Sequence, residues 1–193
     1  MRTLTVILVL LLAGCTQGQA DPLASDGPLQ LEVVPGKVGI DAPAGGGPWR
    51  ATFGGLLPCA ETDDVLISRI EYRGRRNDQP IESAWRHVTA KQARDGAMPI
   101  QSAGEESMAR LTRPSDFEAV NGARVVTPCP RPDFRSEGFD ELFVMMDVDD
   151  RGNEISGLRV HYTSNGADYV EDVPWGMQAC GRKATDDFCS QPQ

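Results

Sequence analysis

Positive charge is scarce in this sequence. Its 193 residues carry 19 Lys and Arg against 28 Asp and Glu, which gives a formal net charge of −9. Nucleic-acid binding relies on clustered Lys and Arg that neutralise phosphates, and anionic lipid surfaces attract polybasic segments. We therefore expect no nucleic-acid partner and no electrostatic docking on a membrane.

Histidine is scarcer still, and familiar catalytic motifs are absent. His87 and His161 are the only histidines, and the sequence contains neither Gly-x-Ser-x-Gly nor Ser-x-x-Lys. Those motifs position an activated serine in several hydrolase families. We therefore expect neither enzymatic activity nor a cofactor. The abundant carboxylates leave one enzymatic alternative, a hydrolase of envelope polysaccharide that uses paired carboxylates.

Long hydrophobic runs are also lacking. The run Leu4–Leu12, broken only by Thr5, is too short to cross a bilayer as a helix, which takes about 20 apolar residues. Arg2 precedes this run, and small residues follow it at Ala13 and Gly14. A basic start, a short apolar segment and a small-residue exit are typical of a secretory signal peptide.

The end of this segment, Leu12-Ala13-Gly14-Cys15, resembles the lipobox of bacterial prolipoproteins. The resemblance implies that residues 1–14 are a signal peptide and that Cys15 becomes a lipidated N-terminus carrying fatty acyl chains such as palmitate. It also implies a lipid anchor at the extracytoplasmic face of the cell membrane. Where the cell has two membranes, Thr16 after Cys15 implies the outer membrane and the periplasm.

The segment 15–28 is the expected lipidated cysteine and its tether. After Cys15 it consists mainly of small, polar and turn-forming residues, a composition that favours a flexible linker. Residues 29–193 have the length of a single domain.

Four further cysteines form an even set, which in an exported protein indicates two disulfides. Three pairings are possible, and we expect Cys59–Cys129 and Cys180–Cys189. The first pair shares a Pro-Cys setting, and the second is local and surrounded by turn-forming residues. A zinc site is the alternative, but the sequence has no Cys-x-x-Cys and no histidine near a cysteine.

Alternation of apolar and polar residues recurs along the domain, with turn signals every 8 to 12 residues, which predicts an all-β sandwich or barrel. Residues 141–148 are apolar on both faces and predict a central strand. Asn121-Gly122 predicts a hairpin turn. The other expected strands are 29–33, 65–73 with a bulge near Ser68, 84–89, 157–162 and 168–173, and short helical turns are expected within 88–97 and 104–110.

The segment from Leu142 to Cys180 resembles the closing strands of small Ig-like domains in secreted bacterial lipoproteins, many of them of unknown function. The resemblance implies an Ig-like β-sandwich of Greek-key type with long loops. Two features depart from antibody domains: the spacing from Cys59 to Trp85 is too long, and Thr127 stands where the corner tyrosine belongs. No functional residue is carried over.

An acidic segment gives the best candidate for a metal site, with Asp147, Asp149 and Asn153 as the candidate ligands. The spacing of the first two with Gly152 partly matches a calcium-binding loop. Arg151 and Leu158 then occupy positions where that loop needs oxygen ligands. The simpler interpretation is a solvated turn, and a calcium-stabilised structural module is the alternative.

Two other groups of residues are candidates for ligand binding. Arg73, Arg75 and Arg76 could hold an anionic group, although charges at the end of a strand also protect a sheet edge. Trp85, with Trp49 and Trp175, could form an aromatic face for sugars, although such residues more often fill a sandwich core. His161 is expected on the exposed face of its strand.

These observations together predict a lipid-anchored protein of the cell envelope. We expect a binding or scaffolding module without catalytic activity, whose partner is an envelope protein or polysaccharide.

Overall fold

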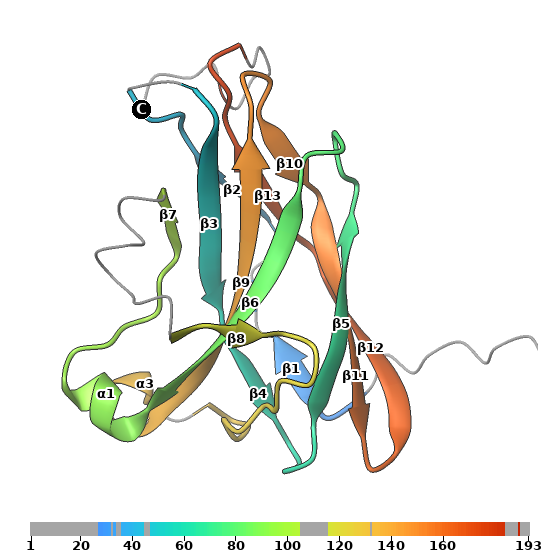
Figure 1. Ribbon diagram of the computed structural model, residues 1–193. Coiled ribbons are helices and arrows are strands. Elements are labelled where there is room, and N and C mark those ends of the chain that lie inside the picture. The colour runs from blue at the N-terminus through green and yellow to red at the C-terminus, as the bar shows by residue number, and fades with distance from the viewer. Residues whose placement is uncertain are drawn as a thin grey trace, which may run out of the picture.

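The computed structural model is mostly β-strand, with two short helices (Figure 1). It describes residues 27–31, 33, 36–44, 47–104, 116–131, 133–183 and 189. The expected signal peptide, Cys15 and nearly all of the expected tether therefore lie outside the described residues. No helix among the residues described is both long and apolar enough to cross a membrane.

The largest sheet has five strands in the order β7-β3-β9-β6-β8. Its long central strand, β9, pairs antiparallel with β3 on one side and β6 on the other. The prediction of a central strand over 141–148 is therefore confirmed. The bounds of this sheet are β3 Trp49–Leu56, β6 Ile81–Thr89, β7 Ser102–Gly104, β8 Glu118–Ala119 and β9 Gly138–Val148.

A three-stranded sheet in the order β12-β11-β5 packs against the five-stranded one, and it stands on the right in Figure 1. Its strands are β5 Leu66–Arg73, β11 Gly157–Ser164 and β12 Ala167–Val173. The pairing of β5 with β11 shifts by one residue, because Arg69 faces His161 while Ile67 faces Tyr162. Ser68 is the extra residue, as the change in its alternation pattern predicts.

Two smaller sheets complete the sandwich. One has the order β10-β13-β2 and the other joins β1 to β4. The bounds of their strands are β1 Leu29–Leu31, β2 Gly36–Ile40, β4 Pro58–Ala60, β10 Asn153–Ile155 and β13 Trp175–Ala179. Together with the larger sheets they confirm the expected all-β, sandwich-like class.

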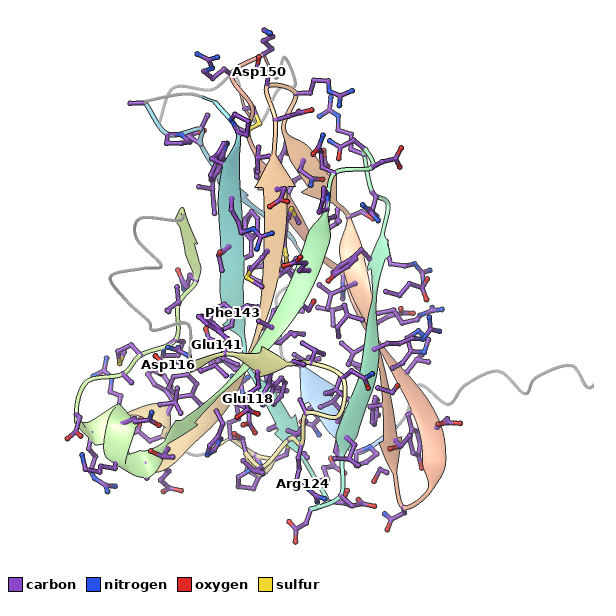
Figure 2. The ribbon with its side chains drawn as sticks, viewed as in Figure 1. Asp116, Glu118, Arg124, Glu141, Phe143 and Asp150 are labelled. Atoms are coloured by element: carbon purple, nitrogen blue, oxygen red, sulfur yellow. A yellow bond between two sulfur atoms is a disulfide. The ribbon has the colours of Figure 1, made fainter. Side chains whose placement is uncertain are left out.

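Apolar side chains fill the space between the sheets (Figure 2). Trp85 and Tyr162, on opposite sheets, are the largest of the buried side chains. Trp49 and Trp175 pack against the rim of the same core. Tryptophan therefore serves mainly to fill and seal the sandwich, as the simpler of the two sequence interpretations predicts.

The helices are brief. α1 spans Ala90–Arg94, within the predicted 88–97, and Thr89 forms a capping box with Gln92 at its start. α3 spans Phe134–Glu137 and was not predicted. Most of the other predicted helical turn, 104–110, lies outside the described residues.

The predicted hairpin around Asn121-Gly122 is wrong. Gly122 has a φ of +86°, but Asn121 is not among the residues with positive φ, as a type I′ turn would require. The chain after the turn bonds to β5 instead, where Ala123 O accepts from Ile67 N and Val125 N donates to Val65 O. A strand that is distant in sequence, β5, thus replaces the adjacent segment as the pairing partner.

The four described cysteines form the two expected disulfides. Cys59 bonds to Cys129 across 70 residues, and Cys180 bonds to Cys189 across 9. The first joins β4 to the segment that precedes α3. The second joins Cys189 to Cys180, which directly follows β13.

Candidate functional site

Polar side chains gather around a pocket at the end of the sandwich where β3 begins and β9 ends. We call it the end pocket. It has a volume of about 610 Å³ and is lined by Pro48, Trp49, Arg50, Gln79, Asp147, Val148 and Asp149. An aromatic ring beside several polar side chains makes this pocket a candidate site for a small ligand.

The pairing of β3 with β9 builds one side of the end pocket. Arg50 lies directly opposite Asp147, and its Nε donates to Asp147 Oδ1 over 2.8 Å. Its Nη1 donates to Glu82 on β6 over 3.2 Å. The hydrogen bond to Asp147 is the largest of the effects that raise the pKa of Arg50. Carboxylates from β9 and β6 therefore hold this guanidinium in place.

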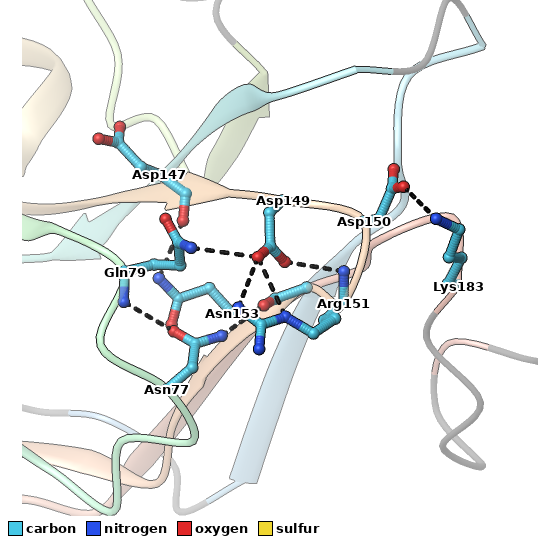
Figure 3. Close-up of polar contacts among 9 residues, drawn as sticks. Asn77, Gln79, Asp147, Asp149, Asp150, Arg151, Asn153 and Lys183 are labelled. Atoms are coloured by element: carbon cyan, nitrogen blue, oxygen red, sulfur yellow. Dashed lines mark hydrogen bonds and ion pairs between the residues drawn. The ribbon is translucent and has the colours of Figure 1, made fainter.

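The turn after β9 builds the other side (Figure 3). Asp149 Oδ2 accepts from Arg151 Nη2 over 2.8 Å and from Gln79 Nε2 over 3.1 Å, while its Oδ1 accepts from the backbone N–H of Arg151. The side-chain hydrogen bond from Arg151, first among several effects, lowers the pKa of Asp149. Asp149 is therefore an ionised, well-partnered carboxylate.

The loop that carries Gln79 is tied to the same turn. Asn77 Nδ2 donates to Gly152 O over 2.7 Å, and its Oδ1 accepts from Gln79 N over 3.0 Å. Figure 3 shows these contacts beside Asp149, with Asp150 turned away toward Lys183. These hydrogen bonds connect the loop to the turn, and together the two segments form one wall of the end pocket.

Of the three residues proposed as calcium ligands, the structure places two in the end pocket and one outside it. Asp147 and Asp149 both line the pocket, but each is paired with an arginine. Asn153 uses both polar atoms locally, since Nδ2 donates to Asp147 O and Oδ1 accepts from Glu154 N. Within the described part of the chain, no three His, Cys, Asp or Glu residues are grouped as metal ligands.

The three arginines proposed for anion binding do not converge. Arg73 lies 3.7 Å from Glu71 and 3.8 Å from Asp172, and Arg75 donates to Gln79 O. Arg76 lies 3.6 Å from Glu154. Since local acceptors occupy each of them, these residues do not form a shared anion site.

The prediction that Trp85 could contribute to a ligand-binding face is wrong. Its side chain is only 2 % exposed and packs in the main core, so it presents no face to a ligand. Trp49 lines the end pocket instead. The sequence alone does not distinguish Trp49 from Trp85, because their different exposure depends on the positions of β3 and β6 in the sheet.

The histidines also differ from expectation. His161 is buried rather than exposed, with Nε2 3.2 Å from Glu71 Oε2. His87 is half-exposed, and its Nδ1 lies 2.9 Å from Oδ1 of the fully buried Asp140. That contact, as the largest effect, raises the pKa of His87. Sequence reasoning missed the pair because it depends on the register between β6 and β9.

The charges of the end pocket bear on the hydrolase alternative. Such an enzyme needs one carboxyl group with a raised pKa to act as the acid. Asp149 has a lowered pKa, and Asp147 is held by Arg50.

Comparisons with known proteins give no match. No family model, no curated protein and no solved structure is similar to this chain.

Proposed function

We propose that this protein is a lipid-anchored binding module of the cell envelope, without catalytic activity, and that the end pocket is its binding site. The lipobox-like Leu12-Ala13-Gly14-Cys15 supports the anchor. The observation that carries the binding role is a pocket whose polar groups are already held by ion pairs. A preorganised site loses less conformational entropy when it binds.

The position of the end pocket fits this role. The domain begins with β1, which pairs with β4, and β4 follows the end of β3. Trp49 stands at the other end of that strand, which spans about 26 Å. In this proposal the tether joins the domain at one end and the pocket opens at the opposite one. The part of the expected tether that precedes the described residues, 15–26, reaches at most roughly 40 Å when fully extended.

Anchoring is tested by comparing the wild-type protein with Cys15→Ser after growth with a labelled palmitate. We expect the label and membrane association in the wild-type protein and neither in the variant. Cys189→Ser provides the matched control, since it removes a cysteine but leaves the lipobox, and it should keep its label. An unlabelled wild-type protein would contradict the anchor.

Binding is tested by sedimentation of the purified domain with isolated cell envelopes. We expect the wild-type domain to sediment and Asp147→Asn to sediment less, because the change removes the charge that holds Arg50. Asp168→Asn on β12 is the matched control, since it removes an exposed charge from a different sheet. Equal sedimentation of both variants would contradict the assignment of the end pocket.

A further inference from the structure

The end pocket retains hydrogen-bonding capacity that its own ion pairs do not use. Asp147 Oδ1 accepts from Arg50, whereas Oδ2 has no partner among the residues that the structure describes. Arg50 donates through Nε and Nη1, and its Nη2 lacks a partner among the described residues. Gln79 donates through Nε2, and its Oε1 lacks a partner within the same set. The pocket thus offers both donors and acceptors on rigid, planar groups.

Its charged groups are nevertheless paired within the protein, with Arg50 shared between Asp147 and Glu82. The two carboxylates that line the pocket, Asp147 and Asp149, each have a guanidinium partner, in Arg50 and Arg151 respectively. An anionic ligand would meet two carboxylates, and an ammonium ligand would meet carboxylates that are already neutralised. The electrostatics therefore favour a ligand that has no charge but carries many hydroxyl groups, because a hydroxyl both donates and accepts.

Apolar surface lies beside these groups. Trp49 is partly buried at the rim of the core and lines the pocket together with Pro48 and Val148. A sugar ring has an apolar face of C–H groups and an edge of hydroxyls. An indole ring next to a carboxylate, a guanidinium and an amide matches both parts of that surface.

We infer that the end pocket binds a neutral carbohydrate, with Trp49 against the sugar ring and with Arg50, Gln79 and Asp147 bonded to its hydroxyls. This inference rests on the proposed binding role and names its ligand class. It also accounts for a binding site whose charges are paired within the protein, because the ion pairs orient the side chains and leave other lone pairs and N–H groups without protein partners among the described residues.

The test is an array of purified oligosaccharides probed with the labelled domain. The array contains neutral hexose and N-acetylhexosamine oligomers, uronic acid oligomers and oligomers with free amines. We expect binding to at least one neutral oligomer, measured again in solution by calorimetry. Trp49→Ala and Gln79→Ala should each raise its Kd, the first by about tenfold or more.

Controls separate this inference from the proposed function. Asp168→Asn should bind the neutral oligomer as the wild-type domain does, and Gln79→Ala tests the site without altering the core. Binding restricted to charged oligomers, or none on the array alongside Asp147-dependent sedimentation with envelopes, would overturn the carbohydrate inference but not the binding role. No binding in either experiment would overturn both.

Discussion

Arg86 and Glu141 form an ion pair inside the five-stranded sheet, where Arg86 Nη2 donates to Glu141 Oε2. Arg86 is 5 % exposed and Glu141 is fully buried. Burial, the largest effect, raises the pKa of Glu141, and the charge of Arg86 opposes it. Glu141 Oε1 accepts from Gly55 N over 2.9 Å and from Ile100 N over 2.8 Å. The carboxylate therefore serves the backbone of β3 and of the segment before β7.

Removing the cation from this pair should be strongly destabilising. Arg86→Met leaves a buried carboxylate without its partner, and we expect the free energy of unfolding to fall by about 3–5 kcal/mol. Denaturation in urea measures the change. A loss below about 1 kcal/mol would show that Glu141 has another source of compensation.

Neutralising Glu141 as well should restore part of that loss. In Arg86→Met/Glu141→Gln, an amide oxygen can still accept from Gly55 N and Ile100 N. In Arg86→Met/Glu141→Leu those two donors lose their acceptor, and each buried unsatisfied group costs about 1–3 kcal/mol. We expect the Gln double variant to be the more stable of the two. The reverse order would mean that apolar packing at this position outweighs the two backbone hydrogen bonds.

His87 should make stability depend on pH. Its pKa is raised in the folded state by the hydrogen bond with Asp140. Protonation therefore favours folding below the unfolded-state pKa of about 6.5, and the benefit is lost as pH rises through the higher folded-state pKa. We expect His87→Gln to lose more stability at pH 5.5 than at pH 8.5, measured against the wild-type protein. An equal loss at both pH values would contradict this linkage.

The two disulfides should differ in their contributions because they close loops of different length. On the loop-entropy model, Cys59–Cys129 contributes about 4 kcal/mol and Cys180–Cys189 roughly 2.7 kcal/mol. We expect Cys59→Ala/Cys129→Ala to lower the urea midpoint more than Cys180→Ala/Cys189→Ala. The opposite order would show that the C-terminal segment depends on its disulfide for packing as well as for entropy.

The parts of the fold that the sequence predicts are those governed by local pattern. Residues 141–148 are apolar on both faces, a pattern typical of a central strand. They form most of β9, which pairs with β3 and β6. The shifted alternation around Ser68 predicts a bulge because side chains alternate strictly along a strand. The disulfides follow from parity and from matching local settings, since few pairings are available to four cysteines.

The parts that escape prediction depend on which distant segments meet. Asn121-Gly122 favours a hairpin, yet the chain beyond it bonds to β5 and the residue before it, and Val125 is buried there. The end pocket combines β3, the loop before β6 and the turn after β9, and no local pattern joins those three. The sequence singles out Asp147 and Asp149 as a solvated turn, with calcium binding as the alternative, but it gives no sign that Arg50 lies opposite Asp147.

Gly152 holds the turn that carries Asp149, and its replacement should reveal how tightly that turn is packed. Gly152 and Gly166 both have positive φ, at +83° and +74°. A Cβ at Gly152 would lie 2.7 Å from Ala179 O, whereas one at Gly166 would meet nothing within 4 Å. Gly166→Ala should therefore lower the free energy of unfolding only by the cost of a positive φ for alanine, about 1–2 kcal/mol. Gly152→Ala should lower it by more in the same urea experiment. Gly152→Ala should also weaken envelope sedimentation, because the turn must move away from β13 and shift Asp149 with it. If the two variants are equally stable and sediment equally, the contact between the turn and β13 does not position the end pocket.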